Sequence, residues 1–285
     1  MNLESLPADQ VEDVLLRHGA QAVTLTDAGN NPVLEPAPGE TPLWNEVRIT
    51  GLFSSSADFD LLREDLLRSL PLKRLPDHRI ETLHDRVWER EWLKDFRPMQ
   101  FGRRLWVCPG EFAVPDEDAV VVRLDPGLAF GTGTHPTTAL CLEWLDGLDL
   151  RNKRVLDYGC GSGILSVASL LLGARSVSAL DIDGQAITAT RQNAERNGVD
   201  SKLATTMDAG TLDGGYDVVV ANILATPLIH HASTICGHLV HGGAIALSGI
   251  LDHQAKTVAR AYRDKVEFEP PAIKAPWARL TGKRI

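Results

Sequence analysis

Residues 155–163 read VLDYGCGSG: an apolar run ends at an acidic residue, and glycines then stand at every second position. A chain that turns at once from a buried strand into a helix, while a ligand approaches its backbone, needs glycine because glycine has no Cβ atom. The flanks agree, since residues 154–157 favour a strand and the apolar residues 164–172 favour a buried helix. The stretch therefore predicts a strand, a ligand-binding loop and a helix, and with them an α/β fold.

A second strand is expected at residues 176–180, and it ends at Asp181, 22 residues beyond Gly159. A carboxylate here accepts both hydroxyl hydrogens of a ribose, so the unit is predicted to bind a nucleoside. A dinucleotide loop reads GxGxxG and presents a helix N-terminus to pyrophosphate, whereas this loop reads GxGxG, with Ile164 at the third glycine position. The spacing favours S-adenosylmethionine, which carries no pyrophosphate. The expected cofactor contacts of this unit are Asp157, Gly159, Gly161, Gly163, Asp181 and Ile182.

The segment before this unit, residues 125–138, reads DPGLAFGTGTHPTT and contains three glycines and four threonines. So many backbone N–H groups and hydroxyls before a helix that starts near Pro136 suit a polar or anionic ligand group. A loop with only a capping role is the alternative. His135 receives no catalytic role, because a lone histidine beside a helix start is as often a hydrogen-bonded structural group. The expected cofactor contacts here are Phe130, Gly131, Thr132 and Thr138.

Residues 216–221, YDVVVA, predict another parallel strand, which ends at Asn222. Open α/β sheets bind ligands at the carboxyl ends of their strands, so the acceptor substrate is expected here. The Asn222 side-chain carbonyl accepts a hydrogen bond from an amine, and the backbone carbonyls of Ile223 and Leu224 add further acceptors. Asn222 and Ile223 are therefore the catalytic candidates, and Asn222 is also a cofactor-contact candidate. The alternative is that Asn222 only caps the next helix.

The remaining segments of residues 119–285 complete the predicted domain. Helical spacing and strand composition predict helices at 185–197, 227–239 and 254–263 and strands at 244–250, 266–268 and 277–282. The fold class is α/β, with a Rossmann-like sheet.

Residues 1–84 predict a smaller α+β (ferredoxin-like) domain, with helices on one face of an antiparallel sheet. Its expected elements are helices at 8–18 and 59–70 and strands at 22–25, 47–53 and 78–83. Between the two domains, residues 85–118 predict a connector with an aromatic helix, because Trp88, Trp92 and Phe96 recur at a spacing of four. This stripe either packs between the domains or contacts the substrate. Strands are expected at 105–108 and 119–124.

Composition excludes several classes of protein. The 285 residues are 44% hydrophobic and carry a formal net charge of −9, which argues against a polybasic nucleic-acid or membrane binder. The four cysteines lie far apart without a CxxC pair, so neither a metal site nor a disulfide framework is expected. The first residues lack a signal pattern, and no apolar run approaches the roughly 20 residues that span a bilayer. A cytoplasmic protein is expected.

Four stretches, in this order and spacing, resemble the PrmA family, the bacterial methyltransferases of large-subunit ribosomal protein eleven: DPGLAFGTGTHPTT, VLDYGCGSGIL, ALDIDGQAI and VVVANILATPL. The WEREW connector and the closing residues 277–284 extend the similarity to nearly the whole chain.

The resemblance implies a class I methyltransferase domain behind a small substrate-recognition domain. It implies S-adenosylmethionine as cofactor and the α-amine and lysine ε-amines of the ribosomal protein as methyl acceptors. Thr138, Gly159, Asp181 and Asn222 become the implied cofactor and active-site contacts. A monomer without direct nucleic-acid or membrane binding is expected.

The sequence departs from the family at its start, because MNLESLPAD leaves little room for the strand that members place before the first helix. Either that edge strand is missing or the start lies further upstream, and the feature in doubt is N-terminal substrate docking.

Three alternative functions stay open. The acceptor could be a glutamine amide or a small molecule. An NAD-dependent oxidoreductase is disfavoured by Ile164 and by the lack of a hydride-relay constellation. A non-catalytic binding module is disfavoured because the sequence contains both the glycine loop at 155–163 and the predicted acceptor residues at 222–224.

Overall fold

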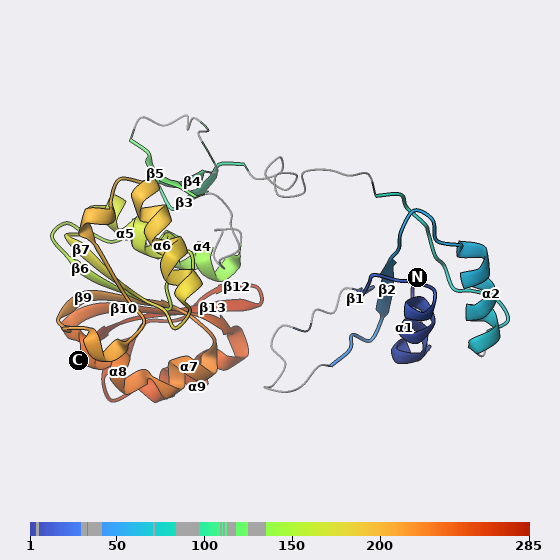
Figure 1. The fold of residues 1–285 in the computed structure, drawn as a ribbon. Coiled ribbons are helices and arrows are strands. Elements are labelled where there is room, and N and C mark those ends of the chain that lie inside the picture. Colours follow the sequence, from blue (N-terminus) through green and yellow to red (C-terminus); the bar gives the residue numbers. More distant parts are fainter. Residues whose placement is uncertain are drawn as a thin grey trace. The chain divides into compact units, whose positions relative to one another are not determined.

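A computed structural model of the chain describes residues 1–3, 6–29, 33, 42–70, 72–83, 97–108, 110, 112, 118–124 and 135–285. The chain forms two compact units, Met1–Arg86 and Val87–Ile285 (Figure 1). Three of the predicted site residues, Phe130, Gly131 and Thr132, lie outside the described residues, as does the aromatic stripe of the connector.

The larger unit is built on an eight-stranded sheet, and its central strands are parallel. Seven strands follow the order β11-β13-β10-β9-β6-β7-β8, with β12 paired to β13. The bounds are β6 Arg154–Tyr158, β7 Ser176–Leu180, β8 Leu203–Thr206, β9 Tyr216–Asn222, β10 Leu239–Leu251, β11 Val266–Phe268, β12 Ala272–Lys274 and β13 Trp277–Arg284. Among the described strands of this sheet, each antiparallel pair involves β13, which pairs with β10, β11 and β12.

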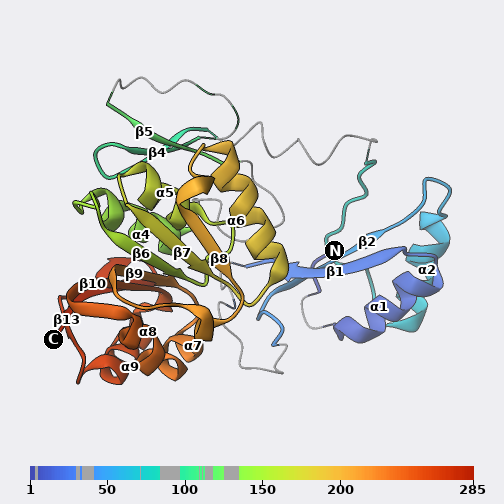
Figure 2. The same cartoon turned by 60° about the vertical axis from the view of Figure 1, so that its left-hand side comes forward.

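Helices cover both faces of the sheet because neighbouring residues of its strands point to opposite faces. Val155 of β6 joins a core with α4 (Pro136–Asp146), α5 (Ile164–Leu171) and α6 (Gly184–Arg196). Leu156, the next residue, joins a second core with α7 (Ala225–His230), α8 (Ala232–His238) and α9 (Asp252–Tyr262). The two helix layers lie on opposite sides of the sheet (Figures 1 and 2).

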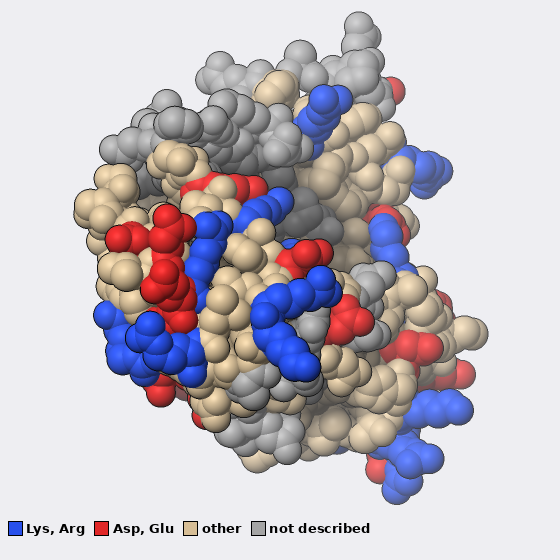
Figure 3. Space-filling model, turned by 90° about the vertical axis from the view of Figure 1, so that its right-hand side faces the viewer, with Lys and Arg blue, Asp and Glu red and all other residues tan. Residues whose placement is uncertain are grey.

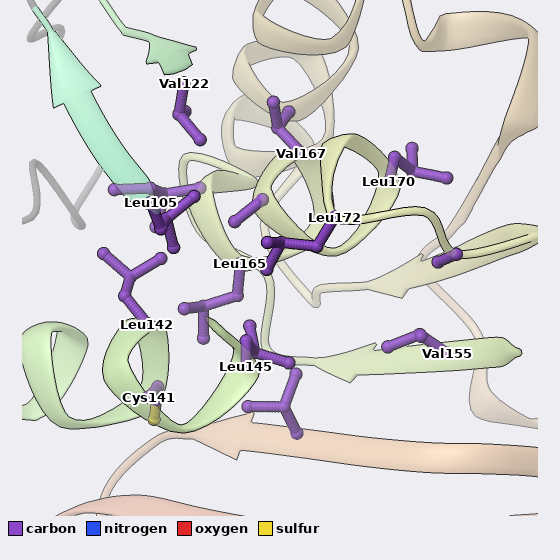
Figure 4. Packing of buried hydrophobic residues seen from close by; sticks show 14 of the residues in the cluster. Leu105, Val122, Cys141, Leu142, Leu145, Val155, Leu165, Val167, Leu170 and Leu172 are labelled. Carbon is purple, nitrogen blue, oxygen red and sulfur yellow. The ribbon is translucent and has the colours of Figure 1, made fainter. Parts of the chain in front are cut away.

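A three-stranded sheet packs on the α4 and α5 side of the same unit. It comprises β3 (Met99–Phe101), β4 (Leu105–Cys108) and β5 (Val120–Arg123). Leu105 and Val122 point toward the two helices, where Leu142 and Leu165 lie (Figure 4). Strands β3 and β4 fall within the segment that the sequence predicted as a connector.

The smaller unit contains α1 (Ala8–Arg17), β1 (Ala22–Asp27), β2 (Val47–Leu52) and α2 (Phe59–Ser69). Strands β1 and β2 are antiparallel, and a core that includes Val11, Ile49 and Leu62 joins them to the helices. These elements agree with the sequence prediction, and the first residues also take part. Asn2 bridges to Arg48, and Met1 N donates to Ile49 O at 2.9 Å, so the short N-terminal segment pairs with β2.

The predicted strand at 78–83 is wrong. These residues have no strand pairing in the structure, and Ile80 and Leu83 are exposed. The described part of the unit therefore has two of the three expected strands, and it does not establish a ferredoxin-like sheet. The predicted helix at 227–239 is also wrong in its extent, because α7 and α8 meet at His231, whose ψ of 9° leaves helical geometry. Strands β3, β8 and β12 were not predicted from the sequence.

Candidate active site

The candidate site lies at the point of the sheet where successive strands are added on opposite sides. Strands β6 and β9 are neighbours, yet the chain goes from β6 to β7 on one side and from β9 to β10 on the other. Such a switch point leaves a crevice at the carboxyl ends of the strands, where α/β sheets bind ligands. The glycine loop follows β6, Asp181 follows β7 and Asn222 ends β9, so the structure brings these predicted site residues to one edge.

The glycine loop is shaped by close packing as well as by space for a ligand. Gly163 has a φ of +75°, and a Cβ atom there would lie within 2.9 Å of the Thr190 backbone. A Cβ atom at Gly159, whose φ is +85°, would lie 2.3 Å from Cγ2 of Ile223. Both positions require glycine because a side chain would meet a neighbouring element.

The backbone N–H groups of the loop are already occupied. Gly159 N and Cys160 N both donate to Leu180 O, at 2.7 and 3.0 Å, and Gly163 N donates to Cys160 O at 2.8 Å. Gly161 N donates to Asp181 Oδ2 at 2.9 Å. A pyrophosphate-binding loop directs such donors at its ligand, whereas these four point into the protein. The geometry favours a nucleoside cofactor without pyrophosphate.

Asp181 is held in place at the end of β7. Its Oδ2 accepts from Gly161 N and its Oδ1 accepts from Asp183 N at 3.0 Å. Each carboxylate oxygen keeps further acceptor capacity for a ligand hydroxyl. Ile182, the next residue, is 88% exposed, so an apolar side chain stands uncovered beside the carboxylate.

Asp157 lies beneath the glycine loop and is fully buried. Ser166 Oγ donates to its Oδ2 at 2.6 Å, and its Oδ1 has no hydrogen-bond partner among the described residues. Burial is the main cause that raises the pKa of the Asp157 carboxyl to about 7. Asp157 therefore presents one unpaired oxygen and exchanges a proton near neutral pH.

The predicted acceptor corner comprises Asn222 at the end of β9 and Thr138 of α4. Asn222 Nδ2 donates to Thr138 Oγ1 at 3.3 Å, and Thr138 is fully buried. Asn222 Oδ1 is buried and has no hydrogen-bond partner in the described part of the chain. An unpaired buried acceptor costs free energy until a ligand donor reaches it. The capping alternative for Asn222 is wrong, because the N-cap of α7 is Leu224.

His135 has a structural role at the start of α4. Its Nδ1 lies 2.7 Å from Thr137 Oγ1 and accepts from Thr137 N at 3.4 Å, as a helix N-cap does. Its ring packs edge-on against Trp277 with centroids 4.7 Å apart, and burial lowers its pKa. His135 therefore serves as the N-cap of α4.

The family described as ribosomal protein L11 methyltransferase (PrmA) matches residues 1–285. The chain belongs to this family. A ribosomal protein L11 methyltransferase from Vibrio cholerae is 50% identical over 287 residues, covering 100% of this chain and 97% of the relative. One from Methylococcus capsulatus is 51% identical over 278 residues, covering 97% of this chain and 95% of the relative.

A solved structure supports the same assignment for the larger part of the chain. The crystal structure of a ribosomal protein L11 methylase from Lactobacillus delbrueckii subsp. bulgaricus is 32% identical, with a TM-score of 0.62. The match covers 66% of this chain and 99% of that chain. The α/β methyltransferase fold predicted from the sequence is confirmed.

Two residues that support the glycine loop of this L11 methyltransferase family member were not predicted from the sequence. Thr190 Oγ1 donates to Gly161 O at 3.0 Å, and Asn193 Nδ2 donates to Ser162 O at 2.8 Å. Both lie on α6, one helical turn apart. Their signal in the sequence is weak: two polar residues, three apart, on a helix that follows the second strand. Met207, directly after β8 and 55% exposed, is a third residue at this edge.

The described residues hold neither a metal centre nor a membrane span. No group of three or more His, Cys, Asp or Glu side chains in the described ranges is arranged to hold a metal ion, and the four cysteines are buried and free. Among the described helices, none combines the length and apolar character needed to cross a membrane.

Proposed function

We propose that this protein transfers methyl groups from S-adenosylmethionine to the α-amino and lysine ε-amino groups of ribosomal protein L11. Its family membership and its full-length relatives support the methyltransferase activity and the substrate. The observation that carries the acceptor chemistry is the buried, unpaired Oδ1 of Asn222 beside the glycine loop.

The residues at the carboxyl edge of the sheet suit this cofactor. Four amides of the glycine loop, at residues 159, 160, 161 and 163, donate to groups of the protein itself. Asp181 offers carboxylate lone pairs for ribose hydroxyls. Ile182 and Met207 provide exposed apolar surface that a purine ring would cover. S-adenosylmethionine, when bound, supplies an electrophilic methyl group on a cationic sulfur. We assign Thr138 and the loop at 130–132 to the same cofactor.

The protein mainly has to orient the amine. At pH 7.4, removing the proton from a lysine amine costs roughly 4 kcal/mol, and from an α-amine well under about 1 kcal/mol. Neither cost requires a strong dedicated base, because desolvation lowers the amine pKa and water carries the proton away. Asn222 Oδ1 accepts an N–H of the neutral amine, which turns its lone pair toward the methyl group.

The smaller unit is proposed to recognise the protein substrate. Residues 1–84 contain none of the cofactor-site residues, so a second role is left for this unit. The formal net charge of −9 favours a basic protein partner over nucleic acid. On the face drawn in Figure 3, acidic and basic side chains of the described residues are interspersed. We further propose that the protein acts as a monomer in the cytoplasm.

The test uses purified protein, L11 and S-adenosylmethionine carrying a labelled methyl group. Mass spectrometry of L11 after reaction is expected to show methylation at the N-terminus and at lysines, and a thermal-shift assay should show stabilisation by S-adenosylmethionine but not by NAD. Label on glutamine or on a small molecule would overturn the amine assignment. Stabilisation by NAD alone would overturn the cofactor.

A further inference from the structure

Strand β10 contains a bulge beside the acceptor corner. From Ala244 to Ser248 the strand pairs with β9 in one register, which ends at the Ser248–Asn222 pair. Its register with β13 shifts between Leu247 and Ile250. Two residues, Ser248 and Gly249, therefore oppose the single residue Arg279. Gly249 has a φ of +82°, in the left-handed region. Bulges of this kind re-aim the chain and are frequent beside active sites.

The bulge fixes the backbone of Ile223. Ile223 N donates to Ser248 O at 3.1 Å. A Cβ atom at Gly249 would lie 2.5 Å from Ile223 O, 2.7 Å from its carbonyl carbon and 2.8 Å from its nitrogen. These are backbone atoms, which cannot rotate away as the end of a side chain can. The Ile223 peptide therefore occupies the space that any side chain at position 249 would need.

Both sides of this contact are anchored to the rest of the site. Ser248 is fully buried, and its Oγ donates to Ala278 O at 3.0 Å and lies 3.5 Å from Thr137 O. Thr137 precedes Thr138, the partner of Asn222. On the opposite side, the Ile223 side chain packs against Gly159 of the cofactor loop. The Ile223 peptide thus lies between the cofactor loop and the bulge.

We propose that Ser248 and Gly249 are positioning residues for methyl transfer, because they hold the Ile223 carbonyl beside Asn222 Oδ1 as a second acceptor for the substrate amine. The inference rests on the proposed function and extends it to residues outside the sequence-based site. An amine held by two acceptors has its lone pair fixed in direction, whereas one acceptor leaves it free to turn.

The first test compares Gly249→Ala with Gly242→Ala. Gly242 lies in the same strand with a φ of +74°, and a Cβ atom there would meet nothing within 4 Å. Both variants carry the left-handed backbone penalty, but only Gly249→Ala displaces Ile223. We expect kcat of Gly249→Ala for L11 to fall at least about tenfold below that of Gly242→Ala. The Kd for S-adenosylmethionine, measured by calorimetry, should stay within about twofold of wild type.

A second pair keeps the test valid if Gly249→Ala does not fold. Ser248→Ala removes the buried hydroxyl without adding a clash, and Ser169→Ala removes a matched buried hydroxyl that donates to Leu165 O within α5. We expect Ser248→Ala to lower kcat several-fold with cofactor Kd unchanged, and Ser169→Ala to leave kcat near wild type.

The outcomes separate the two proposals. Wild-type protein that transfers no methyl group to L11 amines overturns the proposed function. Active wild-type protein with equal kcat in Gly249→Ala and Gly242→Ala, or in Ser248→Ala and Ser169→Ala, overturns the positioning role. A loss of cofactor affinity that accounts for the whole fall in activity overturns it too.

Discussion

Asn222 Nδ2 donates to Thr138 Oγ1 at 3.3 Å, which joins two residues that stand 84 positions apart in the sequence. This bond fixes the side-chain amide and leaves Oδ1, rather than the NH2 group, without a hydrogen-bond partner among the described residues. An amide that loses its partner rotates about its last bond and presents the wrong atom. The hydroxyl of Thr138 is therefore expected to control the orientation of the acceptor oxygen.

Substituting Asn222 or Thr138 should slow methyl transfer more than it weakens cofactor binding. We expect Asn222→Ala to lower kcat by about 100-fold, because one misplaced contact at the reacting group has effects of this order. Thr138→Val keeps the shape and removes the hydroxyl, so a smaller loss is expected. Single-turnover transfer to L11 measures both. Unchanged turnover in Asn222→Ala would contradict the orienting role.

Asp181 is expected to govern cofactor affinity. Asp181→Ala removes the carboxylate proposed for the ribose and also the acceptor of Gly161 N. Losing a charged hydrogen-bond partner costs roughly 1.5–3 kcal/mol, so the Kd for S-adenosylmethionine should rise by at least about tenfold.

The control for this prediction is Asp183→Ala, two residues away. The Asp183 side chain caps α6 by accepting from Gln185 N. The bond between Asp183 and Asp181 uses the backbone nitrogen of Asp183, so the substitution to alanine keeps it. The variant should lose roughly 1 kcal/mol of stability with cofactor affinity preserved. Equal Kd values for the two variants, measured by calorimetry, would contradict the ribose assignment.

The sequence was most informative where elements are buried on both sides. Residues 154–157 and 216–221 form parallel strands whose central residues are apolar and buried, and these apolar residues are visible in the sequence. Strand β8, Leu203–Thr206, was missed because it lies at the sheet edge and its side chains are only half-buried or exposed. The strand predicted at 78–83 was wrong because a strand also needs a paired neighbour.

In the candidate site, the positions of strand ends could be predicted from the sequence, whereas packing contacts could not. The placement of Asp181 and Asn222 at one edge could be predicted, because Asp181 follows β7 and Asn222 ends β9. The contacts around them could not be predicted, because Thr190 meets Gly161 across 29 positions and Gly249 of β10 meets Ile223, which follows the neighbouring strand β9. Such contacts depend on how helices and strands pack, which local patterns do not encode.

Thr190 is expected to stabilise both the fold and the cofactor loop. It is fully buried, and its hydroxyl donates to Gly161 O. Thr190→Val replaces the hydroxyl by a methyl group and leaves the Gly161 carbonyl without this donor. We expect the free energy of unfolding in urea to fall by about 1–3 kcal/mol and the cofactor Kd to rise.

Thr188→Val is the matched control on the same helix. Its hydroxyl also donates to a carbonyl, Gly184 O at 2.9 Å, but it is exposed and remote from the loop. This variant should change the free energy of unfolding by less than about 0.5 kcal/mol. If the two valine variants bind the cofactor equally well, Thr190 does not support the loop.

Asp157 should make the protein less stable as the pH rises toward neutrality. Its carboxyl pKa is raised from 3.8 to about 7 in the folded protein, mainly by burial, with a further contribution from the charge of Asp181. Between these values the folded state holds a proton that the unfolded chain has lost. Stability from this group is therefore full below pH 3.8 and is lost as the pH rises to about 7, by roughly 4 kcal/mol.

The measurement is the free energy of unfolding of wild type and Asp157→Asn from pH 4 to pH 7. Asparagine resembles the protonated carboxyl and does not titrate, so the variant should gain stability relative to wild type across this window. Asp149→Asn is the control: bonds from Arg151 lower the Asp149 pKa to about 2, so its effect changes only below pH 3.8. A constant difference between wild type and Asp157→Asn from pH 4 to 7 would contradict a neutral buried carboxyl.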